Sequence, residues 1–263
     1  MPRACLPSLA LYPKTRLKSD RGPSVEDGRK KDDSPVAEDG VEELRKKVRK
    51  LRRTQQRNAR VAWAEGFLTA VCGLLRPGDV AIDCGANVGA VSARLLASGA
   101  DVIAFDPEPW AVEKLKERFS GHPRYQLHNV AVGCGEGSIT LFRAANFDQN
   151  EKNASVKSTV VSGGRMINEA DGAGISVAQI NFVTFLQNLV AERGEIAFLK
   201  MDIEGAELDL LEAMDRADLF ASIRCTVAET HETKFADLRP RYEALRVHFA
   251  QRYRPEHVNL DWI

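Results

Sequence analysis

The stretch Asp79-Val-Ala-Ile-Asp-Cys-Gly-Ala-Asn-Val-Gly89 decides the fold of this 263-residue chain. Its apolar residues 80–82 predict a strand, which ends in the acid Asp83. Two glycines follow, at 85 and 89, and a helix-forming run begins at residue 90. A parallel strand that feeds a helix through a glycine turn places backbone N–H groups at the carboxyl edge of the sheet, where open α/β sheets bind nucleotides. The stretch therefore predicts an α/β fold with a nucleotide-type ligand.

The spacing of these glycines distinguishes several kinds of loop. A dinucleotide loop needs G-x-G-x-x-G, and its middle glycine is missing here. A Walker loop needs Gly-Lys-Ser/Thr at its end, whereas Ala90 and Val91 follow the second glycine. Asp83 would repel a phosphate and attract an ammonium, which favours a cofactor with an amino-acid end, such as S-adenosylmethionine. A tight turn whose glycines serve packing alone is the alternative. The residues predicted to hold the cofactor are Asp83, Gly85, Ala86, Asn87 and Gly89.

A second acid strengthens the prediction of a nucleoside site. The apolar run Asp101–Phe105 predicts the next strand, and Asp106 ends it. An acid about 20 residues beyond the first glycine is placed to accept hydrogen bonds from ribose hydroxyls. Both NAD and S-adenosylmethionine carry that ribose, so Asp106 indicates a nucleoside without separating the two. A helix cap or turn is the alternative role for this residue.

The charge distribution argues against a nucleic-acid enzyme. The formal net charge is zero. Residues 1–60 hold 17 Lys and Arg against 9 Asp and Glu, which leaves 20 against 28 for the rest of the chain. A catalytic domain with excess acid would repel phosphates, so we expect no nucleic-acid partner. Five scattered cysteines without a C-x-x-C pair fit a reducing cytoplasm, where we expect the protein.

The N-terminal part of the chain divides into a tail and a helix. Residues 1–38 lack a hydrophobic period, which predicts disorder. A basic amphipathic helix is predicted over 39–76 from the spacing of Val41, Leu44, Val48 and Leu51. Three roles are open for its segment 41–60. It could be a solvated lead-in to the domain, a short coiled-coil seam of a homodimer, or a peripheral contact with an anionic membrane.

Residues 77–263 alternate strands and helices, which predicts one domain with a doubly wound, mostly parallel sheet and helices on both faces. The predicted strands are 79–83, 101–105, 124–131, 196–202 and 223–229. The predicted helices are 88–98, 108–119, 181–193, 205–215 and 235–252. The stretch 137–180 interrupts the alternation, with an extra strand at 138–142 and then polar residues. We interpret it as a lid or insertion over the strand ends, with a surface loop as the alternative.

Acids and one histidine follow the later strands. The fourth strand lies next to the first at the switch point of such a sheet, so Lys200, Asp202 and Glu204 are predicted to share a face beside the glycine loop. A structural ion pair with Lys200, together with helix capping by Glu204, is the alternative. Glu229 and His231 end the fifth strand at the same edge. His231 is a natural general base, although it could be only a structural residue, and the four acidic and imidazole groups could also hold a divalent cation.

These motifs, together with Asn129-Val-Ala-Val132, resemble those of the FkbM family of methyltransferases over residues 75–263. The run Lys200-Met-Asp-Ile-Glu-Gly-Ala-Glu207 is the most specific part of the resemblance. The resemblance implies a Rossmann-like class I methyltransferase fold, S-adenosylmethionine as cofactor, and O-methylation of a hydroxyl on a small molecule, sugar or glycolipid. No metal is included in this prediction.

The resemblance also implies roles for single residues. Asn129 and Ala131 would flank the adenine. His231 or Asp202 would accept the hydroxyl proton, with Glu204 and Glu229 orienting that base or the acceptor. The residues predicted to be catalytic are His231, Asp202, Glu204 and Glu229.

Three features depart from the family pattern. Asp106 stands where the family usually has Glu, and Asn181 opens a helix entry that usually carries acids. The chain ends soon after Trp262, so the last antiparallel hairpin looks incomplete and a sheet edge could be open for dimerisation. Two other functions are weighed against methyl transfer. One is a non-catalytic nucleotide-binding scaffold, and the other, disfavoured by the missing glycine, is an NAD(P)-dependent oxidoreductase.

Overall fold

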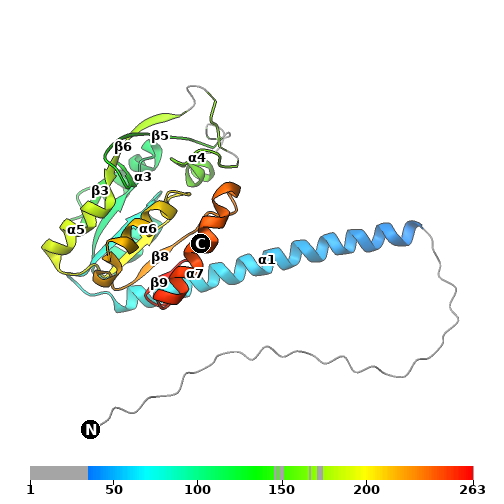
Figure 1. Ribbon diagram of the computed structural model, residues 1–263, viewed down its shortest axis with the longest axis horizontal. Helices are drawn as coiled ribbons and strands as arrows, with labels where there is room; N and C mark the ends of the chain where they lie inside the picture. The colour runs from blue at the N-terminus through cyan, green and yellow to red at the C-terminus, as the bar shows by residue number, and fades with distance from the viewer. Residues whose placement is uncertain (1–34, 145–146, 148–150, 166, 171–173, 263) are drawn as a thin grey trace, which may run out of the picture. The chain divides into compact units, whose positions relative to one another are not determined.

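The computed structural model describes residues 35–144, 147, 151–165, 167–170 and 174–262. The chain forms two units, residues 1–51 and 52–263, which are considered separately. Most of the predicted disordered tail lies outside the described residues, and helix α1 (Pro35–Leu74) begins within its last four positions (Figure 1). Among the described helices, none is long and apolar enough to cross a membrane.

Helix α1 is amphipathic but meets different surroundings along its length. Within the first unit, the apolar side chains Val41 and Leu44 are exposed, and ion pairs such as Lys47–Glu43 (2.8 Å) link its charged residues. Within the second unit, Ala64 and Leu68 are buried in the hydrophobic core. The carboxyl-terminal part of α1 is therefore a structural element of the second unit.

The core of the second unit is a six-stranded sheet with the order β3-β2-β1-β7-β8-β9, in which every pairing is parallel (Figure 1). This confirms the predicted α/β class and the position of the fourth predicted strand beside the first. The strands are β1 (Val80–Cys84), β2 (Asp101–Phe105), β3 (Tyr125–His128), β7 (Phe198–Met201), β8 (Thr226–Ala228) and β9 (Val258–Asn259). Register places Asp83 opposite Lys200. The last of these strands, β9, pairs parallel with β8 rather than forming an antiparallel hairpin.

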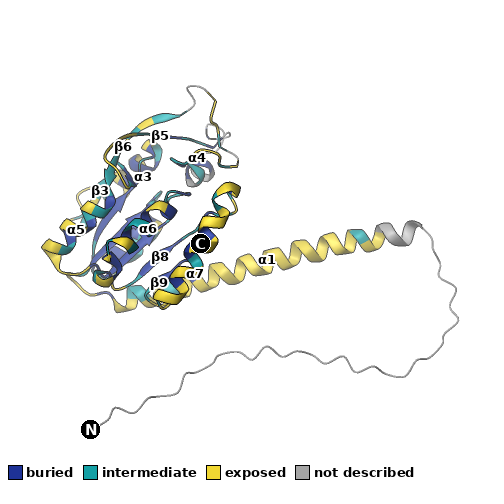
Figure 2. Cartoon of the chain, in the orientation of Figure 1, coloured by how far each residue is buried: buried dark blue, intermediate teal, exposed yellow. Residues whose placement is uncertain are grey.

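Helices cover both faces of this sheet, which is why its strands are apolar on both sides (Figure 2). Ile82 and Leu199 face a cluster with α5, α6 and α7, whereas Ala81 and Phe198 face a cluster with α1 and α2. The helices are α2 (Ala90–Ala97), α3 (Pro109–Phe119), α5 (Phe182–Arg193), α6 (Glu207–Arg216) and α7 (Arg239–Arg252). The cluster of α5, α6 and α7 contains the larger share of the buried aliphatic and aromatic side chains.

The predicted third strand differs from the structure, and the stretch 137–180 contains a strand that was not predicted. The stretch 124–131 is not one strand, because β3 ends at His128 and β4 (Ala131–Gly133) joins a second sheet. In that sheet, β5 (Gly137–Leu141) and the unpredicted β6 (Ile175–Asn181) pair antiparallel, and β4 pairs parallel with β6. The polar stretch between β5 and β6 carries the short helices α4 (Glu151–Ala154) and η2 (Ser155–Lys157).

Two further 3₁₀ helices complete the described elements, namely η3 (Leu219–Ser222) and η4 (Ala236–Leu238). Helix α5 begins at the position where this chain departs from the family pattern, and a side chain caps its first turn. Asn181 accepts a hydrogen bond from the Thr184 backbone N–H at 3.1 Å. An asparagine is among the preferred residues at this position because its side chain satisfies a free N–H of the first turn. The departure at Asn181 therefore has a structural role.

Candidate active site

The glycine loop after β1 is shaped by the close approach of two strand ends. Gly85 has φ +74°, and a Cβ there would lie 1.8 Å from the backbone oxygen of Asp202. Only glycine fits at this contact between the ends of β1 and β7. Asn87 also has a left-handed conformation, with φ 49°, which lets its N–H point toward β2. The loop thus brings the ends of β1, β2 and β7 together, as the sequence predicted.

Asp106 lies at the centre of this junction. Its Oδ2 accepts a hydrogen bond from the Asn87 N–H at 2.7 Å, and its Oδ1 accepts one from the Glu108 N–H at 2.9 Å. Burial raises the pKa of Asp106 to about 6, although these hydrogen bonds and Lys200 oppose the rise. Each carboxylate oxygen has two acceptor positions, so each retains one for a ligand. Asp106 therefore remains able to accept two ribose hydroxyls.

A cavity opens beside Asp106, and we refer to it as the first cavity. Its walls are apolar where Phe105, Val130 and Leu141 lie and polar at Asp106 and Glu108. This mixture suits a nucleoside, which has a flat base and a hydroxylated sugar. Of the two residues predicted near adenine, Ala131 is buried and lines this cavity. Asn129 is exposed and lies outside the lining, while its neighbour Val130 is part of it.

The segment that follows β5 forms part of the wall of the first cavity, and an ion pair and hydrogen bonds of its side chains hold it there. Arg143 forms a bidentate pair with buried Glu108, with Nη2–Oε1 at 2.5 Å and Nε–Oε2 at 3.1 Å. Ser155 Oγ donates to Asn87 Oδ1 at 3.3 Å, and Thr159 Oγ1 donates to the Glu204 backbone oxygen at 2.7 Å. Sequence reasoning missed the Arg143–Glu108 pair. Glu108 followed by Pro109 is typical of a helix start, so the sequence identifies Glu108 as a cap. It does not show that Arg143, 35 residues later, is its partner.

Asp83 and Lys200 lie beneath the glycine loop. Asp83 is fully buried, accepts a hydrogen bond from Ser92 Oγ at 2.7 Å, and lies 3.3 Å from Lys200 Nζ. Lys200 Nζ also donates to the backbone oxygens of Cys84 and Gly85, at 3.2 and 2.8 Å. Asp83 therefore supports the loop from beneath it and is not part of the lining of the first cavity. Gly89, the last predicted loop residue, starts α2 with φ +75°.

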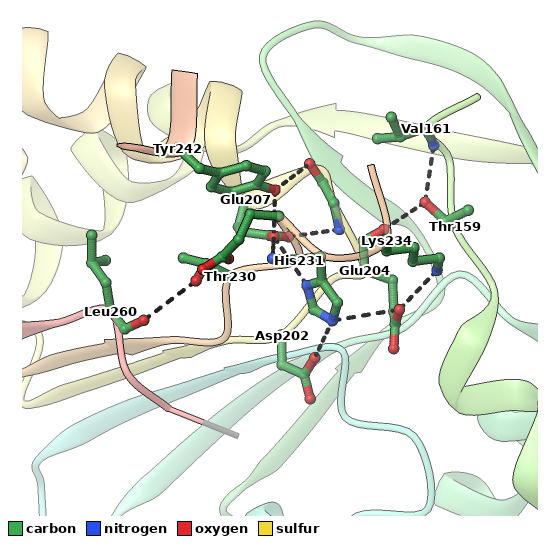
Figure 3. Close-up of polar contacts among 12 residues, drawn as sticks. Thr159, Val161, Asp202, Glu204, Glu207, Thr230, His231, Lys234, Tyr242 and Leu260 are labelled. Atoms are coloured by element: carbon green, nitrogen blue, oxygen red, sulfur yellow. Dashed lines mark hydrogen bonds and ion pairs between the residues drawn. The ribbon is translucent and has the colours of Figure 1, made fainter. Parts of the chain in front are cut away.

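The predicted shared face of Lys200, Asp202 and Glu204 is only partly formed. Strand β7 ends at Met201, so the alternation stops before the two acids. Asp202 still lies 3.4 Å from Lys200 Nζ, as the structural alternative expected. Glu204 has φ 59° and turns instead toward Lys234, at 2.8 Å, and His231, at 3.4 Å (Figure 3). The expected capping of α6 by Glu204 is wrong, because Glu207 accepts the Gly205 N–H instead.

Glu207 organises the histidine. It is fully buried, and its Oε1 accepts hydrogen bonds from the His231 N–H and from Tyr242 Oη, at 3.0 and 2.7 Å. The same oxygen lies 3.0 Å from His231 Nδ1, which fixes the proton on that nitrogen (Figure 3). Sequence reasoning did not assign Glu207 a role, although it stands in the most specific motif of the chain. The other ring nitrogen, Nε2, faces Glu204 and Asp202.

His231 is an imidazolium in this network. Burial lowers the pKa of His231, but its hydrogen bonds to Glu204 and Glu207 outweigh burial and raise it to about 11. The donor atoms of Asp202, Glu229 and His231 lie within 4.8 Å of one another, which would be near enough for one cation. A metal ligand needs a free lone pair on Nε2. A cation would therefore have to displace the proton on Nε2, and no metal centre is assigned to these residues.

A second cleft, of about 610 Å³, lies next to the first cavity, and its lining includes the acids Glu65, Asp202 and Glu229 together with Lys200. Burial raises the pKa of Asp202, with Lys200 and His231 opposing the rise. Burial and repulsion by Asp202 raise the pKa of Glu229 to about 7. The first cavity and the second cleft share Gly85, Asn87 and Asp202 in their linings. A carboxylate with a pKa near neutrality at such a junction is suited to proton transfer.

Comparisons with known proteins agree on one family. Residues 83–255 match the model of the methyltransferase FkbM domain. The chain is 30% identical over 179 residues to 31-O-demethyl-FK506 methyltransferase FkbM of Streptomyces tacrolimicus, and the match covers 60% of this chain and 67% of that protein. Among solved structures, methyltransferase FkbM from Methylobacillus flagellatus is 22% identical with a TM-score of 0.30, over 55% of this chain and 32% of that one. The family match spans the strand ends that carry Asp83, Asp106, Asp202 and Glu229.

Proposed function

We propose that this chain, which belongs to the FkbM family of methyltransferase domains, transfers a methyl group from S-adenosylmethionine to a hydroxyl oxygen of a small molecule, sugar or glycolipid. One observation carries the proposal. A cavity with apolar and polar walls and an acid-lined cleft meet at Gly85, Asn87 and Asp202, so a donor and an acceptor can approach each other there. The Streptomyces relative is, by its name, a 31-O-demethyl-FK506 methyltransferase that methylates an oxygen, which supports the same chemistry here.

The first cavity would hold the nucleoside part of the cofactor. Asp106 would accept the two ribose hydroxyls through its two free acceptor positions, and Phe105, Val130 and Ala131 would contact the adenine. The loop 85–87 would lie against the methionine part, held in place from below by Lys200 and Asp83. When bound, the cofactor would supply a sulfonium methyl group, which is transferred to the acceptor oxygen as its bond to sulfur breaks and the neutral thioether leaves. Positioning the two reactants is therefore much of the catalysis.

A base must accept the proton of the acceptor hydroxyl. Sequence reasoning favoured His231 or Asp202. Glu229 is better suited in this structure, because it lines the cleft and its pKa is about 7, whereas His231 is protonated with a pKa of about 11. We therefore propose that Glu229 accepts the proton, with Asp202 beside it. His231 and Glu204 act as positioning residues that hold these acids in place.

Calorimetric titration with S-adenosylhomocysteine tests the cofactor, with NAD as the comparison ligand. We expect saturable binding of the former and none of the latter. Asp106→Asn should weaken that binding about ten- to a hundredfold, since a hydrogen bond to a charged group contributes about 1.5–3 kcal/mol. Asp237→Asn, at an exposed acid on η4, is the matched control and should bind normally. Failure of the folded protein to bind S-adenosylhomocysteine, or equal binding by both variants, would contradict the proposal.

The assignment of the base has its own test once an acceptor is identified. Glu229→Gln should lower turnover by about 10²–10⁴ while S-adenosylhomocysteine still binds, as expected for loss of a general base. His231→Gln should lower turnover less and should shift the pH profile, because it alters the charge that faces Asp202. A larger loss in His231→Gln than in Glu229→Gln would return the role to His231.

A further inference from the structure

One face of α1 passes from the core of the second unit into the second cleft. Arg57, Arg60, Ala64 and Leu68 follow one another at spacings of three and four residues, so they share that face. Ala64 and Leu68 are 4% and 3% exposed and pack into the core with Trp262. Arg57 and Arg60 lie one to two turns earlier, are exposed, and line the cleft. The buried part of the helix therefore fixes where these two arginines stand.

Neither arginine is used by the protein itself. Across the part of the chain that the structure describes, Arg57 and Arg60 form no hydrogen bond or ion pair, whereas other basic residues of α1 do, as in Arg49–Glu42 at 2.8 Å. Glu65, an acid on the same helix that also lines the cleft, is already paired with Arg94 at 2.5 Å. Two unpaired guanidinium groups on one wall of a cleft are a binding feature for a planar or tetrahedral anion.

The lining of the same cleft also carries acids. Asp202 and Glu229 line it, with Lys200 paired to Asp202 at 3.4 Å, and Asp202 also lines the first cavity. A neutral acceptor would leave the arginines without a partner, and an acceptor that is anionic throughout would be repelled by the acids. A molecule with an anionic group at one end and a hydroxyl at the other can pair its anion with the arginines and place its hydroxyl beside the acids.

We propose that the methyl acceptor carries a phosphate or carboxylate that binds Arg57 and Arg60, while its hydroxyl lies toward Glu229. This inference rests on the proposed function and narrows its substrate class from any hydroxyl compound to an anionic one. The anion can belong to a free small molecule or to a lipid headgroup, and the two sources share this chemistry.

Paired probes test the charge preference on protein saturated with S-adenosylhomocysteine. The pairs are glycerol with glycerol 3-phosphate, glucose with glucose 6-phosphate, and glucose with glucuronate, each titrated calorimetrically at constant ionic strength. We expect the anionic member of at least one pair to bind about ten- to a hundredfold more tightly than its neutral partner. Arg57→Gln/Arg60→Gln should abolish that preference. Arg52→Gln/Arg53→Gln removes the same charge from exposed positions of α1 outside the cleft and should retain it.

The lipid source is tested by sedimentation with phosphatidylinositol vesicles, compared with phosphatidylcholine vesicles. Binding lost only in Arg57→Gln/Arg60→Gln would assign the anion to a headgroup, whereas a preference seen only with soluble probes would assign it to a free molecule. The proposal is overturned if no probe pair and no vesicle shows a charge preference, or if both double variants lose it equally, since the general charge of α1 would then explain the binding. Normal binding of S-adenosylhomocysteine in that case would leave the proposed function intact, and its absence would contradict the function instead.

Discussion

Burial of Glu229 should make the folded protein less stable at neutral pH, and Glu229→Gln should remove that penalty. The pKa of Glu229 rises from 4.5 to about 7, which corresponds to about 3 kcal/mol. Between these two values the unfolded chain has released the proton and the folded chain still holds it. The free energy of unfolding therefore falls as pH rises, and the loss is complete above about pH 7. The amide introduced by Glu229→Gln does not titrate, so the variant keeps the stability that the wild type loses.

Contact with water at the cleft screens the charge and reduces the effect, so we expect a difference of roughly 1–3 kcal/mol. Urea unfolding followed by circular dichroism at pH 5, 7 and 8.5 measures it. The free energy of unfolding of Glu229→Gln, relative to the wild type, should increase from pH 5 to pH 8.5.

The control for this experiment is Glu243→Gln, at an exposed position of α7. Its stability relative to the wild type should change little with pH. If the difference between Glu229→Gln and the wild type does not change with pH, then the carboxyl is not held protonated by burial, and the reason for choosing it as the base is lost.

Three further changes test parts of the fold. Leu68→Ala, at a side chain that is 3% exposed, should lower the free energy of unfolding in urea by about 2–5 kcal/mol. Leu74→Ala, at a side chain that is 69% exposed, should change it by no more than about 0.5 kcal/mol. Equal losses in the two variants would mean that α1 does not pack as described. Glu207→Gln should cost about 1.5–3 kcal/mol, since it removes the carboxylate that pairs with His231 Nδ1 and accepts from Tyr242, and should lower the His231 pKa measured by NMR; an unchanged pKa would contradict the network. Asn181→Ala should cost about 1 kcal/mol in unfolding free energy through loss of the α5 cap, and no loss would argue against that cap.

Strands β1, β2, β7 and β8 could be predicted because each is a short, mostly apolar run followed by a glycine or an acid. Strand β3 was predicted too long, and the two-residue strand β9 was not predicted. The predicted bounds of β1 and β2 differ from the structure by at most one residue. The second sheet was missed because β6 is not apolar enough to stand out. Its residues alternate between partly buried and exposed, and it lies inside a stretch that otherwise looks like a polar loop. Local patterns also cannot show that β4 leaves the path of β3 and pairs with a strand more than 40 residues later.

The site was predictable where its residues follow strand ends, and not where turns or distant partners decide. Asp106, Asp202 and Glu229 reach the cavity and the cleft because parallel strands share a carboxyl edge. Glu204 could not be placed from the alternation of a strand, since the strand ends before it and its left-handed backbone turns the side chain away. The protonation of His231 depends on Glu207, and that contact exists only in the folded chain.

The charges around Glu229 also predict how ligand binding moves protons. A positive sulfonium beside Asp202 would favour the ionised form of Glu229, whose pKa is about 7, whereas the neutral thioether of S-adenosylhomocysteine would not. The two ligands are otherwise nearly identical, so any contribution from Asp106 cancels between them. Titration at pH 7 in MOPS and in imidazole, which differ in ionisation enthalpy, should show more proton release with S-adenosylmethionine, by up to about half a proton. This difference should disappear in Glu229→Gln. Equal release by both ligands in the wild type would mean that the donor methyl does not lie near these acids. More proton release with S-adenosylmethionine would mean that Glu229 loses its proton when the methyl donor binds. Glu229 would then be able to act as a base only when the cofactor is bound.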